Sequence, residues 1–377
     1  MNSTAALDSL GQRLWLDNIT RDLLVRGTLQ RYVRDFAVSG LTSNPTIFDL
    51  AIRNTHLYDD AIRDATQHGR SGEALFLDLA LEDLTSAADL FRPIHDATAG
   101  MDGWASLEVS PLRADNAAAT VRETLRLHAL AGRPNLFIKI PGTRAGVSAI
   151  EESIFAGVPV NVTLLFSREQ YLAAAEAYLR GVERRIGAGL DPKVDSVASI
   201  FVSRWDVAVK DVVPPALRNR LGIAIAQRAY KAYRELLVSP RWRKLAAAGA
   251  RPQRLLWAST GSKDPEASDT LYVEALAAPD TVNTMPDKTL IAFADHGQLR
   301  GELPADGGDA EATLAEFTRA GVDDAALAEQ LLREGTLSFD KSWASLLECI
   351  AVKAHGLGKG AITPRADVSR RDAAKLP

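Results

Sequence analysis

The chain has 377 residues, of which 46% are hydrophobic and 24% are charged, and its formal net charge is -4. This length can bury a large core as one big domain or two ordinary ones, and the charge gives no reason to expect nucleic acid as a partner. No run reaches about 18 apolar residues and the N-terminus lacks a signal-peptide pattern, so we expect neither a membrane span nor export. The single cysteine, Cys349, fits a reducing compartment, and we expect a cytoplasmic protein.

Eight short apolar segments alternate with helical ones along the chain. In chain order, they are residues 13–17, 40–46, 104–109, 135–143, 159–166, 197–202, 254–260 and 282–285. No hairpin signal lies between any two of them, so the pattern predicts parallel strands in repeated strand–helix units. Eight such units close into a (β/α)8 TIM barrel. The alternative is an open, doubly wound sheet, which would normally show a glycine-rich phosphate turn that this chain lacks.

Two regions add helices to the predicted barrel. Residues from about 50 to 103 are charged, alanine-rich and helical in period, and we predict a helical insertion there instead of a separate domain. Stretches at 311–320, 324–333 and 338–356 predict C-terminal helices that pack over the barrel. We therefore expect residues 1–377 to form one barrel domain that ends in a loose tail of about a dozen residues.

The fourth predicted strand carries a lysine in its middle. Lys139 lies between Ile138 and Ile140, in a run too short for a buried helix. Strands of parallel sheets are covered on both faces, so an ammonium group there is costly and the neutral amine is favoured. A neutral amine can condense with a carbonyl to give a Schiff base. From this residue alone, a structural ion pair or a side chain reaching solvent explains the pattern about equally well.

Polar residues recur at or near the ends of seven of these strands. They are Asp17, Asn44, Glu108, Lys139, Asn161, Thr163, Ser199, Arg204 and Ser259. Asn161 and Thr163 are two residues apart, so both point to the same side of their strand. TIM barrels collect their chemistry at the C-terminal ends of the strands, and we expect these side chains to share one site. Taken singly, Asp17 could cap a helix, Asn44 could form an Asx turn, and Ser259 could begin a loop.

Three blocks of sequence resemble the transaldolase family. They are Gly40–Phe48, Phe137–Thr143 and Asn161–Ser167, and the likeness extends from about residue 10 to 355. The resemblance implies a class I Schiff-base aldolase barrel that uses no metal and no cofactor. It also implies transfer of a dihydroxyacetone unit from sedoheptulose 7-phosphate or fructose 6-phosphate to glyceraldehyde 3-phosphate or erythrose 4-phosphate. This is a step of the non-oxidative pentose phosphate pathway.

The resemblance also implies a role for each matched residue. Lys139 matches the Schiff-base lysine, and Asp17 matches the acid–base group that takes the proton from the C4 hydroxyl. Glu108 matches a carboxylate that acts through a bound water, with Thr163 as its hydrogen-bond partner. The ligands of the retained unit match Asn44, Asn161 and Ser199, and the phosphate ligands match Arg204 and Ser259.

The chain departs from the family at the phosphate end. Many members have a second phosphate-binding arginine two residues after the serine that Ser259 matches, and this chain has Gly261 there. We predict that Lys263 supplies the missing charge as a point cation, with Ser262 as an extra donor. The alternative is that Lys263 is an ordinary surface lysine.

Four other functions compete with a transaldolase. Simple aldolases of the same superfamily release free dihydroxyacetone, but they tend to carry glutamine at the position of Glu108 and tyrosine at that of Phe201. A barrel that only binds sugar phosphates would not need Lys139, Asp17 and Glu108 together. A pyridoxal-phosphate enzyme would also use a buried lysine. Metal-dependent aldol chemistry is the weakest option, because the six histidines show no ligand spacing. The expected partners are sugar phosphates, without nucleic acid or membrane, in a monomer or homodimer.

Overall fold

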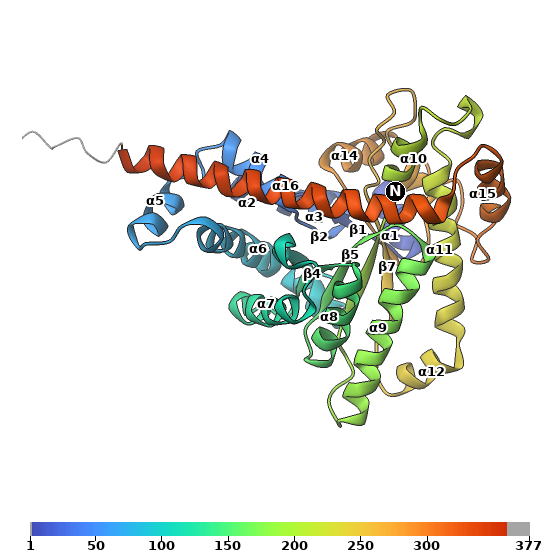
Figure 1. Cartoon of the computed structure of the whole chain (residues 1–377), viewed down its shortest axis with the longest axis horizontal. Coiled ribbons are helices and arrows are strands. Elements are labelled where there is room, and N and C mark those ends of the chain that lie inside the picture. The colour runs from blue at the N-terminus through green and yellow to red at the C-terminus, as the bar shows by residue number, and fades with distance from the viewer. Residues whose placement is uncertain (1, 360–377) are drawn as a thin grey trace, which may run out of the picture.

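The computed structural model describes residues 2–359, in which eight parallel strands form a ring surrounded by helices (Figure 1). The strands are β1 (Gln12–Leu16), β2 (Val38–Leu41), β3 (Ala105–Glu108), β4 (Leu136–Pro141), β5 (Val160–Leu165), β6 (Ser196–Phe201), β7 (Gln253–Ala258) and β8 (Thr281–Met285). Their order is β2-β1-β8-β7-β6-β5-β4-β3. A single parallel bridge between Gly40 and Trp104 joins the two ends of this order. The predicted (β/α)8 barrel is confirmed.

Large side chains fill the interior of the barrel below the strand ends. Trp104 and Phe137 stack with ring centroids 4.0 Å apart, and Trp15 lies 6.0 Å from Phe137. A Cβ on Gly40 would lie 2.7 Å from both the Trp104 carbonyl oxygen and the Trp15 indole nitrogen. Glycine is therefore required where the ring of strands closes. The interior is packed at this level, and TIM barrels place their ligand sites at the C-terminal ends of the strands.

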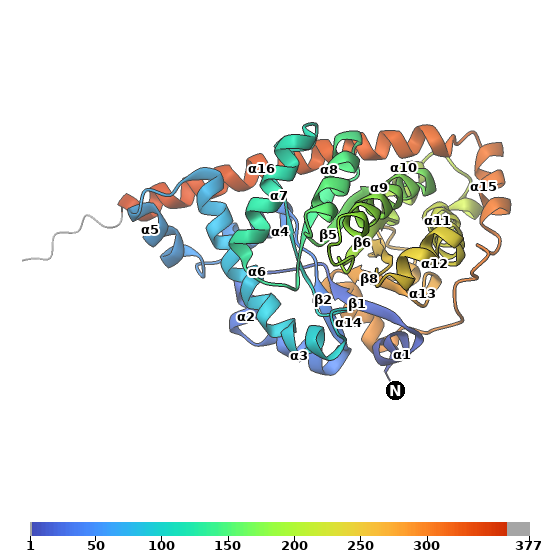
Figure 2. The same cartoon turned by 90° about the horizontal axis from the view of Figure 1, so that it is seen from below.

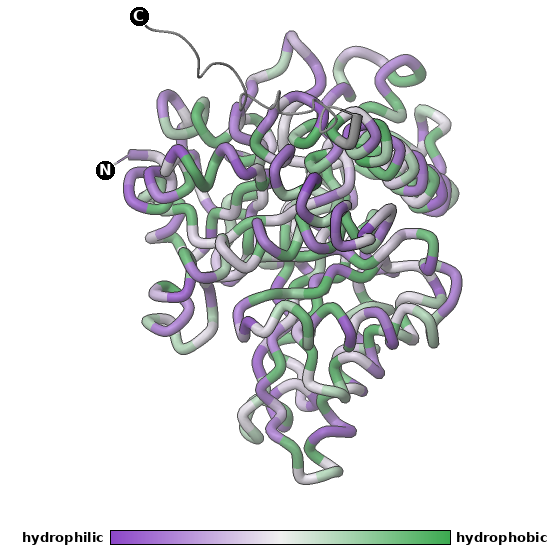
Figure 3. The backbone as a smooth tube through the Cα atoms, turned by 90° about the vertical axis from the view of Figure 1, so that its left-hand side faces the viewer, coloured by the Kyte–Doolittle hydropathy of each residue, from purple (hydrophilic) through white to green (hydrophobic). Residues whose placement is uncertain are grey.

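Helices connect the strands and cover the outside of the barrel (Figure 2). They are α1 (Ser3–Leu10), α2 (Arg21–Val25), α3 (Thr28–Phe36), α4 (Pro45–Asn54), α5 (Asp59–Gln67), α6 (Gly72–Ala97), η1 (Pro111–Arg113), α7 (Ala117–Ala131), α8 (Arg144–Phe155), α9 (Arg168–Gly187), α10 (Ser203–Val209), η2 (Pro215–Leu217), α11 (Leu221–Val238), α12 (Pro240–Ala247), α13 (Leu271–Ala275), α14 (Asp287–His296), α15 (Ala310–Arg319) and α16 (Asp324–Lys359). Hydrophobic and hydrophilic residues are interspersed along them (Figure 3), as expected of helices with one buried face.

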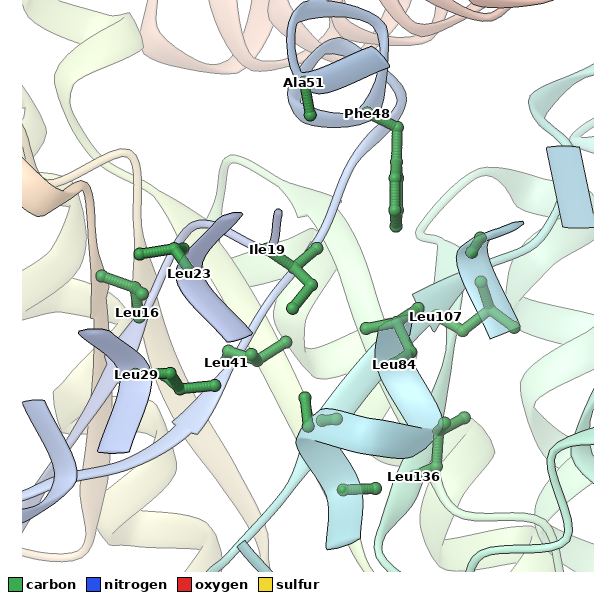
Figure 4. Close-up of a cluster of buried hydrophobic side chains, with 14 of the residues drawn as sticks. Leu16, Ile19, Leu23, Leu29, Leu41, Phe48, Ala51, Leu84, Leu107 and Leu136 are labelled. Carbon is green, nitrogen blue, oxygen red and sulfur yellow. The ribbon is translucent and has the colours of Figure 1, made fainter. Parts of the chain in front are cut away.

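The segment between β2 and β3 holds three helices, α4, α5 and α6, where most connections in the barrel hold one or two. Their apolar faces join the outer faces of the neighbouring strands in one buried cluster. Figure 4 shows part of it, with Leu16, Leu41 and Leu107 from strands and Phe48 and Leu84 from helices. This packing fixes α4 against the barrel, and α4 begins directly after Asn44.

The C-terminal segment differs from the prediction. Residues 324–359 form one uninterrupted helix, α16, instead of the two helices expected at 324–333 and 338–356. Gly335 lies inside it, and a Cβ there would be 3.0 Å from Cδ2 of Leu164. The glycine thus permits close approach of α16 to the end of β5 and does not end the helix.

In Figures 1 and 2, α16 runs along the whole molecule from α15 to α5. Within residues 2–359, no helix is both long enough and apolar enough to cross a membrane. The tail predicted at the last dozen residues lies outside the described part of the chain.

Candidate active site

Lys139 projects from β4 into the barrel, on the same face of the strand as the stacked Phe137. Its side chain is almost entirely buried, and the residue is 5% exposed. Nζ donates a hydrogen bond to the backbone carbonyl of Ser43 at 2.9 Å and lies 3.4 Å from Oε2 of Glu108. The lysine therefore sits in a fixed position at the upper end of the packed interior.

Two carboxyl groups flank this amine in different surroundings. Glu108 is paired with Lys139 across adjacent strands, and burial raises the pKa of its carboxyl to about 7 although Lys139 opposes the shift. Asp17 follows β1 and accepts a hydrogen bond from Thr42 Oγ1 at 2.8 Å. Burial also raises the pKa of Asp17, against the lowering effects of Lys139 and Thr42. Two groups of this kind can divide acid and base tasks between them.

A cavity of about 530 Å³ lies over Lys139 at the C-terminal ends of the strands. Eight of the ten predicted site residues line it: Asp17, Asn44, Lys139, Thr163, Ser199, Arg204, Ser259 and Lys263. Glu108 and Asn161 do not line it. Glu108 lies behind the cavity wall, where it contacts Nζ of Lys139. Asn161 accepts a hydrogen bond from Ser199 Oγ at 2.7 Å and donates to Ser106 Oγ at 3.2 Å. The barrel topology thus brings together side chains that lie more than 240 residues apart in the sequence.

Thr163 has a hydroxyl group that the rest of the protein leaves unused. Its side chain is fully buried, and Oγ1 has no hydrogen-bond partner in the described chain. The structure shows no direct hydrogen bond between Thr163 and Glu108 within residues 2–359. Since a buried hydroxyl without a partner is costly, this position fits a bound water or a substrate group.

Asn44 serves as a helix cap and also lines the cavity. Its side-chain oxygen accepts a hydrogen bond from the backbone N–H of Ile47 at 3.1 Å, which caps α4. Its side-chain NH2 group makes no hydrogen bond to any described residue. The capping contact leaves that NH2 group available as a donor to an oxygen in the cavity.

Positive charge gathers on one side of the cavity. Arg204, on α10, lines the cavity and forms no ion pair in the part of the chain that the structure describes. Lys263 is exposed at the rim and likewise pairs with no carboxylate among residues 2–359. Ser259 directly follows β7, and its Oγ is 2.8 Å from Oγ of Ser203. Two cations without an acidic partner, beside hydroxyl donors, suit an anionic group of a ligand.

Sequence reasoning missed several residues that line the cavity. Ser203 directly precedes Arg204 and could have been found from that neighbour. Thr42 and Thr284 share a hydrogen bond of 2.8 Å beside Asp17, and both lie on predicted strands. Ser338 and Phe339 come from α16, and nothing in their local sequence indicates that this helix reaches the site.

The chain is similar over most of its length to known proteins of one family. Residues 14–350 match the family model described as Transaldolase/Fructose-6-phosphate aldolase. A transaldolase of Parafrankia sp. (strain EAN1pec) is 46% identical over 91% of this chain and 96% of its own length. Transaldolases of Frankia alni and Thiobacillus denitrificans are 45% and 44% identical, over 93% and 92% of this chain and 97% and 99% of their own.

Proposed function

The chain belongs to the transaldolase/fructose-6-phosphate aldolase family, and we propose that Lys139, Asp17 and Glu108 carry out its reaction. It is a transaldolase, which transfers a dihydroxyacetone unit from a ketose phosphate to an aldose phosphate. The observation that carries the assignment of residues is the position of Lys139, a buried amine that faces the cavity and interacts electrostatically with two buried carboxyl groups.

The proposed reaction begins when the neutral amine of Lys139 attacks the ketone carbon of the donor sugar. The resulting carbinolamine loses water to give a protonated imine. Glu108 supplies the proton for this step through a water molecule held by the unpartnered hydroxyl of Thr163. Its raised pKa keeps a large share of the carboxyl protonated near neutral pH.

The protonated imine then serves as the electron sink for carbon–carbon cleavage. Asp17 takes the proton from the C4 hydroxyl, the C3–C4 bond breaks, and its electrons move to the imine to form an enamine. The first aldose leaves, and the enamine attacks the aldehyde carbon of the second. Hydrolysis of the new imine releases the product ketose and regenerates Lys139.

Hydrogen bonds hold the retained three-carbon unit during this exchange. Asn44 donates from its free NH2 group to a hydroxyl of the unit, and the hydroxyl oxygen of Ser199 accepts from another. Asn161 contributes through Ser199, because its Oδ1 accepts the O–H of Ser199 and so orients that hydroxyl. At the other end of the substrate, Arg204, Ser259 and Lys263 bind the phosphate group.

A transferase and a simple aldolase differ in their need for an acceptor. With fructose 6-phosphate alone, the enzyme releases no more than about one glyceraldehyde 3-phosphate per active site, because the enamine persists on Lys139. Added erythrose 4-phosphate restores continuous turnover and yields sedoheptulose 7-phosphate. Continuous release of free dihydroxyacetone without any acceptor contradicts the proposal.

The remaining proposals concern the cellular location, the oligomeric state and the domain organisation of the enzyme. We propose a cytoplasmic location, which the single cysteine, Cys349, supports. Its ligands are sugar phosphates. For its oligomeric state, the prediction of a monomer or a homodimer stands. The predicted single domain with an insertion at about 50–103 also stays a prediction.

A further inference from the structure

Ser203 and Ser259 form a pair of hydroxyl groups on the wall of the cavity. Ser203 opens α10 after β6, and Ser259 follows β7. Their side-chain oxygens are 2.8 Å apart, and the backbone N–H of Ser203 donates to the carbonyl of Ser259 at 3.0 Å. Both residues line the cavity beside Arg204, although Ser203 itself is only 1% exposed. Ser203 and Ser259 are therefore joined to each other by one backbone bond and one side-chain bond.

The pair has one hydrogen-bond donor to spare. Each hydroxyl carries one O–H, and only one of the two is used between the oxygens. The other O–H has no acceptor among residues 2–359. When Ser203 donates to Ser259, the O–H of Ser259 is free to donate to an oxygen in the cavity. An O–H that both accepts and donates is polarised by the bond it accepts, which strengthens its own donation.

The backbone of Ser259 is held in a conformation that serine rarely adopts. Its φ angle is 57°, in the left-handed region. Two backbone hydrogen bonds hold Ser259 and the residue before it. Val202 N–H donates to the carbonyl of Ala258, and Ser203 N–H donates to the carbonyl of Ser259. Strained residues of this kind persist where surrounding contacts hold them, and they concentrate at ligand sites. The direction of the Ser259 side chain is thus set by its contacts with the end of β6.

We propose that Ser203 is a positioning residue for recognition of the substrate phosphate, and that it acts through Ser259. Ser203 donates to Ser259, and Ser259 donates its free O–H to an anionic oxygen of the phosphate, beside the guanidinium of Arg204. This inference rests on the proposed function, since it takes the ligand at this wall to be a sugar phosphate. It adds a residue that the sequence did not single out, and it assigns a function to the hydrogen bond between the two hydroxyls.

The test compares two acceptors that differ only in the phosphate, glyceraldehyde 3-phosphate and glyceraldehyde, with fructose 6-phosphate as donor. The variants Ser203→Ala and Ser203→Gly remove the hydroxyl and keep the backbone bond to Ser259. Without Ser203, the hydroxyl of Ser259 is no longer oriented toward the phosphate, and its hydrogen bond to that charged group weakens. We therefore expect kcat/KM for glyceraldehyde 3-phosphate to fall about tenfold, mainly through KM. The value for glyceraldehyde should stay within about twofold of the wild type.

Ser196 provides the matched control. It is buried at the other end of β6, where its Oγ donates to the carbonyl of Val160 at 2.7 Å and accepts from Gln253 at 2.9 Å. Ser196→Ala also removes a hydroxyl that joins neighbouring strands, and it should leave the ratio of the two acceptors unchanged. If either Ser203 variant changes both acceptors equally, or neither, Ser203 has no role in phosphate recognition. A wild-type enzyme that transfers nothing would instead contradict the proposed function.

Discussion

Glu108 and Asp17 both interact electrostatically with the amine of Lys139, yet their hydrogen-bond partners differ. Glu108 contacts Lys139 directly and does not line the cavity, whereas Asp17 lines the cavity and is held by Thr42. Burial raises the pKa of both carboxyl groups. The difference in position suits Glu108 to the steps at the imine nitrogen and Asp17 to those at the sugar chain.

The first prediction concerns the pH dependence of Glu108. Its pKa of about 7 means that the protonated acid is present below that pH and is lost as pH rises through it. We expect kcat to fall on the alkaline side of about pH 7 when imine formation limits the rate. Glu108→Gln should lower kcat about a hundredfold and remove this limb from the profile.

A second buried carboxylate gives the control for that profile. Glu123, on α7, is also buried but pairs with Arg126 outside the barrel. Glu123→Gln should keep the alkaline limb of the wild type. An unchanged limb in Glu108→Gln would show that another group controls it.

The second prediction concerns Lys263. If it replaces the second arginine, Lys263→Ala should raise KM for erythrose 4-phosphate about fivefold and leave KM for erythrose unchanged, because only the phosphate loses a cation. Lys193 is an exposed lysine that precedes β6, at the opposite end of the barrel, so Lys193→Ala should alter neither value. An equal effect of Lys263→Ala on both acceptors would remove Lys263 from the phosphate site.

At the scale of elements, the strands were predictable and the contacts of α16 were not. Each strand is a short apolar run between turn signals, which a parallel strand buried on both faces requires. The site residues within or just after these runs could be found because barrel topology places strand ends together. Ser338 and Phe339 reach the same cavity from a helix whose local sequence carries only its own period.

The C-terminal helix shows the same limit. Gly335 lies between the two helices predicted at 324–333 and 338–356, and in the structure it permits a contact with Leu164, more than 150 residues earlier in the chain. Long-range packing of this kind leaves no local signal. Ser259 is similar, since its left-handed backbone depends on contacts with the end of β6 that sequence reasoning does not reveal.

The third prediction tests how closely α16 packs on the barrel. Gly335→Val places side-chain atoms against Leu164, so we expect the free energy of unfolding to fall by about 1 to 3 kcal/mol. KM should rise as well, because displacing α16 moves Ser338 and Phe339 at the cavity.

Gly356 on the same helix provides the control. A Cβ there would meet nothing within 4 Å, so Gly356→Val changes helix propensity alone. Its unfolding free energy should change by no more than about 0.5 kcal/mol. If Gly335→Val matched this variant in stability and KM, the close approach of α16 would not matter to the site.

At the scale of the whole molecule, α16 packs against the segment that follows Asn44, far from it in the sequence. Thr46, close after Asn44, donates to Ser342 Oγ at 2.9 Å, and Asp49 of α4 accepts from Ser345 Oγ at 2.8 Å. Farther along α16, Lys353 pairs with Asp59 at 2.7 Å. Helix α4, which begins directly after the proposed substrate ligand Asn44, is thus held by α16, the last helix within residues 2–359. Helix α16 also supplies a part of the cavity wall that the eight strands alone do not.

The central claim is that the buried amine of Lys139 forms a covalent imine with the donor sugar. Borohydride reduces such an imine to a stable secondary amine, so incubation with fructose 6-phosphate and borohydride should inactivate the enzyme. The adduct should add the mass of one three-carbon unit to the peptide that contains Lys139, and Lys139→Ala should carry none. An adduct on any other lysine, or full activity after reduction, would contradict the account.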